Sequence, residues 1–105
     1  MASSRGYLEY VLEQLSGLDG ISWRAMMGEY VIYYKGRIPG GIYDDRFLVK
    51  KTPAALALMP VAVTEIPYEG GSGMLLVEEI DDRHFLEELF NAMYDELPEP
   101  KRRKK

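Results

Sequence analysis

Aromatic and basic side chains alternate along the middle of the chain, in a pattern that could hold an anionic or a protein partner. They are Tyr33, Lys35, Arg37, Tyr43, Arg46 and Lys50. Tyrosine rings beside cations can stack on bases while the cations hold phosphates, and Tyr and Arg are also enriched in protein–protein interfaces. The simplest alternative is a solvated sheet face, on which long cationic side chains lie over tyrosine rings. These six residues form the candidate interaction face.

The residue types that most catalytic and metal sites use are scarce in this chain. It has no cysteine and one histidine, His84, which follows Asp81-Asp82. A histidine near carboxylates could ligate a metal or relay protons, but any helix that begins with acidic residues produces this spacing. Ser72 lies in a glycine-rich loop that lacks the G-x-S-x-G pattern of a serine nucleophile. We therefore predict no enzyme activity, no metal and no cofactor.

The charges divide the chain into an acidic body and a basic end. The candidate basic tail consists of Lys101, Arg102, Arg103, Lys104 and Lys105. It could hold an anionic lipid or a nucleic acid, or it could simply be a solubilising end. The eight other basic side chains face 17 acidic ones, so residues 1–100 carry a net charge of −9. Because a body of this sign repels phosphate over roughly 8–10 Å, we favour a protein partner over a nucleic acid.

Length and hydropathy predict one domain without a membrane segment. The chain has 105 residues, of which 47% are hydrophobic, which is enough for a single core. No apolar run approaches the roughly 20 residues of a membrane span, and the N-terminus shows no secretion signal. We expect a cytoplasmic protein with a domain over residues 1–97 and a flexible tail over residues 98–105.

Hydrophobic spacing and capping residues predict three helices. The first begins after a serine cap and carries an apolar stripe with i, i+3, i+4 and i+7 spacing. Thr52-Pro53 opens a short second helix that ends before Pro60, because threonine caps a helix and proline suits its first position. Asp81-Asp82 caps the third helix, which ends at Pro98. The apolar stripe of the first helix consists of Leu8, Val11, Leu12 and Leu15.

Aromatic and β-branched residues predict the strands between these helices. Residues 21–34 are expected to form one long strand with a bulge at Gly28, followed by strands over residues 37–43 and 46–50 that complete a meander. Residues 62–68 and 74–79 are two further strands. The order α-β-β-β-α-β-β-α predicts an α+β fold, a two-layer sandwich whose antiparallel five-stranded sheet has its helices on one face.

Strand alternation predicts which side of the meander faces the helices. Side chains two residues apart share a face, so Ile32, Ile42 and Val49 are expected to point inward. The candidate interaction face then lies on the opposite, outer side of the sheet.

Residues 24–50 resemble the core of the TfoX/Sxy family, N-terminal domain. This stretch reads RAMMGEYVIYYKGRIPGGIYDDRFLVK, and the family pattern is R-x-M-F-G-G-Y-G-L-Y-x-x-G-K-x-F-G-L-I-x-D-D-x-L-Y-L-K. The early Leu-Glu-Gln-Leu helix and the late Pro-Tyr-Glu-Gly stretch fit as well, so the chain is similar to a small stand-alone member without the C-terminal domain. The resemblance implies a two-layer α+β fold similar to that of secretion chaperones. It also implies a role linked to the regulation of DNA-uptake competence, and it supplies no catalytic residues.

These observations together predict a non-enzymatic binding or regulatory module that acts by protein–protein contact. The contact would use the outer sheet face or an edge strand, and a homodimer is one form of it, because an open sheet leaves edges to cover. The first alternative is a nucleic-acid accessory factor that uses the basic face and the tail. The second alternative is a small enzyme or metal-binding protein.

Overall fold

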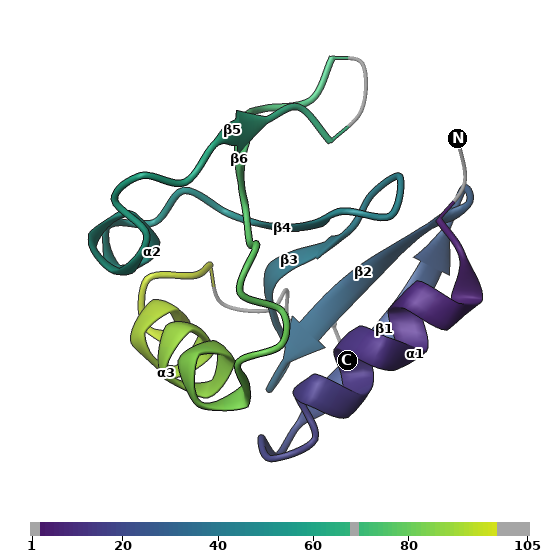
Figure 1. Ribbon diagram of the computed structural model, residues 1–105, viewed down its shortest axis with the longest axis horizontal. Coiled ribbons are helices and arrows are strands. Elements are labelled where there is room, and N and C mark those ends of the chain that lie inside the picture. The colour runs from purple at the N-terminus through teal and green to yellow at the C-terminus, as the bar shows by residue number, and fades with distance from the viewer. Residues whose placement is uncertain (1–2, 68–69, 99–105) are drawn as a thin grey trace, which may run out of the picture.

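The computed structural model describes residues 3–67 and 70–98, along which the helices and strands follow the order α-β-β-β-β-α-β-β-α (Figure 1). The helices are α1 (Arg5–Gln14), α2 (Pro53–Leu58) and α3 (Arg83–Tyr94). The strands are β1 (Ile21–Met26), β2 (Glu29–Tyr34), β3 (Arg37–Ile42), β4 (Phe47–Val49), β5 (Thr64–Glu65) and β6 (Met74–Leu76).

The strands form one open antiparallel sheet in the order β1-β2-β3-β4-β6-β5. The first four strands are a meander, and β6 lies between β4 and the short edge strand β5. The predicted α+β class and antiparallel sheet are confirmed. The sheet has six strands rather than the expected five.

The extra strand arises because residues 21–34 form a hairpin. The prediction of one long strand with a bulge at Gly28 is wrong: β1 runs back along β2, with Trp23 opposite Ile32. Met27 and Gly28 both have left-handed backbone conformations, with φ of 53° and 87°. Two such residues in a row form the two-residue turn that matches the twist of an antiparallel hairpin.

The helices begin at the predicted capping residues. The Ser4 hydroxyl accepts a hydrogen bond from the Tyr7 amide at 3.1 Å, and the Thr52 hydroxyl accepts one from the Ala55 amide at 3.1 Å. At the start of α3, an Asp82 carboxylate oxygen accepts from the backbone of the first turn. Each side chain satisfies an amide that has no partner inside its helix, which fixes where the helix starts.

β5 and β6 are shorter than the sequence indicates. β5 contains only Thr64 and Glu65, and β6 ends at Leu76. Pro67 has no amide hydrogen to donate to a strand ladder, so pairing cannot continue through it. The sheet therefore tapers toward the β5 edge.

The helices α1 and α3 pack on the same face of the sheet, and α2 packs against α3 (Figure 1). Ile32, Ile42 and Val49 are fully buried in this core, as the strand alternation predicts. The side chains of α1, of its C-cap Leu15 and of α3 in the same core are Leu8, Val11, Leu15, Leu86, Leu89, Phe90 and Met93. Among the described residues, no helix lies on the other face of the sheet, so a site there is built from the strands and their connections.

Candidate binding site

The outer face of the sheet has its own small set of buried apolar residues. Val31, Leu48 and Met74 are only 8%, 0% and 9% exposed, yet they do not belong to the core cluster under the helices. Leu48 lies opposite Gly41 on one side and Leu76 on the other, which places these positions on the face away from the helices. This face therefore has an apolar floor.

A pocket of about 470 Å³ lies beside this floor. Cavities of roughly 300–1,000 Å³ are the usual size of small-ligand sites. Tyr43 and Lys50, two members of the candidate interaction face, line this pocket. The other lining residues are Ile38, Gly40, Lys51, Pro67, Ser72, Gly73 and Met74.

The Tyr43 side chain leans back over the end of β3. A Cβ atom at Gly41 would lie 3.0 Å from the Tyr43 hydroxyl and 3.1 Å from an atom of its ring. The ring thus rests close to the backbone of Gly41, where any side chain would crowd it. The glycine therefore lets the aromatic ring form a low wall of the pocket.

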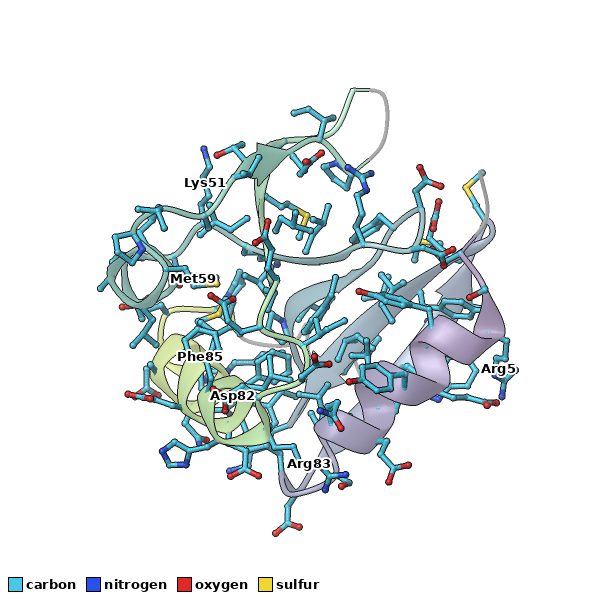
Figure 2. All side chains as sticks on the ribbon, viewed as in Figure 1. Arg5, Lys51, Met59, Asp82, Arg83 and Phe85 are labelled. Carbon is cyan, nitrogen blue, oxygen red and sulfur yellow. The ribbon has the colours of Figure 1, made fainter. Side chains whose placement is uncertain are left out.

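The two pocket lysines have no counter-ion within residues 3–67 and 70–98. Neither Lys50 nor Lys51 takes part in an ion pair there, and no aspartate or glutamate is among the lining residues that the structure describes. Lys50 is half-buried, and its loss of solvation lowers the pKa of its ammonium group. Lys51 lies beside β5, at the end of the molecule away from α3 (Figure 2). The pocket is therefore locally positive.

Arg46 closes one side of this region through contacts with β5. Its Nη1 atom lies 2.7 Å from a carboxylate oxygen of Glu65, and its Nη2 atom donates to the carbonyl of Ile66 at 3.3 Å. Its Nε atom donates to the Tyr43 carbonyl at 3.0 Å. Arg46 thereby ties the β3–β4 turn to β5 and neutralises Glu65.

Arg37 does not lie on the outer face, and its predicted place there is wrong. Its Nη1 atom donates to the carbonyls of Tyr94 at 2.8 Å and of Leu97 at 3.3 Å, and its guanidinium lies 4.2 Å from the centre of the Tyr94 ring. A register shift in the β2–β3 ladder pairs Arg37 with Tyr34, whose ring is in the core. One extra residue in the ladder moves the arginine to the helix side.

Lys35 lies at the same end of the sheet as Arg37. Its Nζ atom lies 5.2 Å from the centre of the Tyr34 ring and 5.7 Å from that of Tyr94. Tyr33 is half-buried opposite Ser22 of β1 and does not line the pocket. The six candidate residues therefore do not share one site: the structure brings Tyr43, Arg46 and Lys50 together and places Lys35 and Arg37 beside Tyr94.

The remaining sequence candidates have structural surroundings of their own. His84 is exposed on α3, and no group of three or more potential metal ligands occurs in the described part of the chain. Asp45 lies in the β3–β4 turn, where its carboxylate accepts from the amide of Ser4 at 2.7 Å. The basic tail, Lys101 to Lys105, lies outside the described residues. No helix in residues 3–67 and 70–98 has the length and apolar character to cross a membrane.

The second wall of the pocket was missed in the sequence. Pro67, Ser72 and Gly73 belong to the β5–β6 connection, far along the chain from Tyr43. They reach it because β6 pairs with β4 on one side and with β5 on the other, which brings the β5–β6 connection next to the β3–β4 hairpin. Residue alternation predicts which face of a strand a side chain occupies, but it does not predict the order of the strands in the sheet. The one sequence signal at this wall is the proline and glycine content of the connection, which indicates a loop but not where the loop lies.

The fold and the pocket define an α+β domain with a candidate binding site on its open sheet face. No family model matches the chain, and no solved structure matches it. Among curated proteins, it is 26% identical over 105 residues to an uncharacterized 12.7 kDa protein in the trpE 5′ region of Spirochaeta aurantia. The alignment covers 99% of this chain and 91% of that protein. The similarity therefore extends over the whole described domain.

Raising the pH from neutrality toward the ordinary lysine pKa of 10.5 is expected to stabilise the wild type relative to Lys50→Gln. Because the folded chain has the lower Lys50 pKa, the unfolded chain binds more protons between that pKa and the ordinary one, so the free energy of unfolding rises with pH. Urea denaturation of both proteins over this range measures the effect.

The matched variant removes the other alkaline titrations from this comparison. Burial raises the pKa of Tyr7, and the hydrogen bond to Asp81 raises that of Tyr10, but both proteins share these groups. The free energy of unfolding of the wild type minus that of Lys50→Gln should rise with pH. A value that stays constant or falls would contradict the half-buried placement of Lys50.

Proposed function

We propose that the chain is a non-enzymatic binding module that contacts a protein partner in the cytoplasm through the β5 side of its sheet. The observation that carries the proposal is a group of exposed apolar side chains on both sides of β5. Val61, Val63 and Ile66 are 91%, 50% and 51% exposed, and they flank β5 at the end of the sheet. Exposed apolar residues on an edge strand are typical of surfaces that pair with another chain.

One of the exposed apolar residues, Ile66, adjoins the pocket. A Cβ atom at Gly73, which lines the pocket, would lie 3.9 Å from the end of the Ile66 side chain. A partner that covers Ile66 would therefore also reach the mouth of the pocket. We call the three exposed residues together with the pocket the β5 surface.

The arrangement of cations favours a protein over a nucleic acid. Binding to a phosphate backbone depends on many cations that release counter-ions together. On this face Arg46 is paired with Glu65, and Arg37 lies against α3 instead. The β5 surface thus offers two lysines among apolar side chains, which resembles the composition of a protein interface more than that of a phosphate track.

The resemblance to TfoX N-terminal domains gives the proposal a biological setting. We place the protein contact within the regulation of DNA-uptake competence. A partner recovered through the β5 surface would then be a regulator or a component of that process.

Charged substitutions on the β5 surface are expected to reduce capture of the partner on the order of tenfold, because they place carboxylates where apolar contact is required. The test compares the wild type with Val61→Asp/Ile66→Asp in affinity capture from the source organism. Light scattering on the purified chain shows whether the partner is a second copy.

Met27→Asp is the matched control for this experiment. Met27 is 97% exposed and lies in the β1–β2 turn, at the opposite edge of the sheet from β5. We expect it to capture the partner as well as the wild type does. Equal capture by all three proteins, with circular dichroism showing intact folds, would rule out the β5 surface as the contact.

A further inference from the structure

The pocket on the outer face concentrates positive charge in an otherwise acidic chain. Residues 1–100 carry a net charge of −9, yet the lining formed by residues 3–67 and 70–98 includes Lys50 and Lys51 and no carboxylate. The carboxylate of Glu65, on the strand beside it, is already bound to Arg46 at 2.7 Å. The described chain therefore leaves these two ammonium groups without a neutralising partner.

The rest of the lining is suited to an apolar group. Ile38, Pro67 and Met74 contribute aliphatic or thioether surface, and Tyr43 contributes an aromatic wall. Ser72 adds a hydroxyl group that can donate one hydrogen bond. A volume of about 470 Å³ can admit a large side chain together with an attached anionic group.

The partial burial of Lys50 strengthens the case for an anionic occupant. An ammonium group that has lost part of its hydration gains more from a carboxylate than one fully in water, because the local dielectric is lower. Two ammonium groups could also pair with a phosphate dianion, but an isolated phosphate would gain nothing from the apolar walls. The lining thus matches a single carboxylate on an apolar body.

We infer that the pocket binds a carboxylate that adjoins an apolar side chain, with Lys50 and Lys51 holding the carboxylate. The source of this group, an acidic and apolar segment of a protein partner, rests on the proposed function. The recognition chemistry rests on the pocket alone, so a small molecule can test it.

The test is an NMR titration of the full chain with N-acetylphenylalanine and with its neutral amide, which has nearly the same size. We expect the acid to shift the backbone signals of Tyr43, Lys50 and Gly73 and to bind about tenfold more tightly than the amide, because only the acid forms the charged contact. Lys50→Gln should weaken binding of the acid by a similar factor and leave binding of the amide unchanged.

Arg24→Gln serves as the matched control, since Arg24 is an exposed cation on β1 and does not line the pocket. It should bind the acid like the wild type. Lys51→Gln provides a second variant if Lys50→Gln does not fold, and the spectrum itself reports folding. The inference is overturned if the acid and the amide bind equally well, or if the acid causes no shift at the pocket. It is also overturned if both lysine variants bind the acid like the wild type, or if Arg24→Gln weakens binding as much as they do.

The two proposals can fail separately. If the acid binds as expected but partner capture does not depend on Val61 and Ile66, the pocket chemistry stands and the proposed protein contact is wrong. If capture depends on those residues but the acid does not bind, the contact stands and the carboxylate assignment is overturned.

Discussion

Replacement of Gly40 by alanine is expected to lower the melting temperature by roughly 12–24 °C, which corresponds to a loss of about 3 kcal/mol in a domain of this size. A Cβ atom at this position would lie 2.0 Å from the Leu48 carbonyl oxygen and 2.8 Å from the Cα atom of Val49. Both are backbone atoms of β4, so no side-chain rotation can relieve the clash. β3 and β4 would have to separate in the middle of the sheet.

Gly6→Ala is the control, because it makes the same chemical change without a clash. No atom lies within 4 Å of a Cβ atom at Gly6, which is exposed in α1. Alanine favours a helix over glycine, so this variant should gain about 0.5–1 kcal/mol. Thermal unfolding followed by circular dichroism measures both changes. A Gly40→Ala protein that melts within about 2 °C of the wild type would show that the two strands lie farther apart.

The parts of the fold that sequence could predict are those fixed by neighbouring residues. Ser4, Thr52 and Asp82 cap the helices because each side chain reaches an amide only three residues away. The inward positions of Ile32 and Val49 follow from alternation within one strand. By contrast, Gly28 is compatible with a bulge or with a tight turn, and methionine before it lacks the Asn or Asp signal of that turn.

The candidate site could be predicted only in part, because it depends on contacts between distant strands. Tyr43 and Lys50 lie at the pocket because the β3–β4 hairpin keeps regular alternation. Arg37 was misplaced because a single register shift reverses the face of every residue beyond it. The wall from the β5–β6 connection depends on β6 pairing with β4, and nothing in the order of residues specifies that choice.

Phe90→Ala is expected to cost about 3–5 kcal/mol of unfolding free energy. The ring is fully buried, with its centre 5.9 Å from that of Tyr34 and 6.1 Å from that of Phe47. Truncation would leave a cavity where α3 meets the sheet, and the two remaining rings would lose their common partner. Since a domain of this length has a total stability of roughly 5–15 kcal/mol, urea denaturation should show a large fall in the midpoint.

Phe85→Ala separates the loss of this contact from the loss of any aromatic ring on α3. Phe85 is only half-buried, so its removal should cost less than half as much. Similar losses from both substitutions would mean that Phe90 is not the centre of the core.

The same denaturation experiment tests whether the outer face depends on this core. Phe47 contacts Phe90 beneath the sheet, and its neighbour Leu48 forms the apolar floor beside the pocket above it. One three-residue strand, β4, therefore carries both structures. In a domain that unfolds cooperatively, the native NMR signals of Tyr43 and Lys50 should disappear together with the helix signal. We expect this coincidence within each protein, although the shared midpoint lies at lower urea in Phe90→Ala. Loss of the pocket signals at lower urea would mean that the outer face unfolds by itself, and that the core does not hold the pocket in shape.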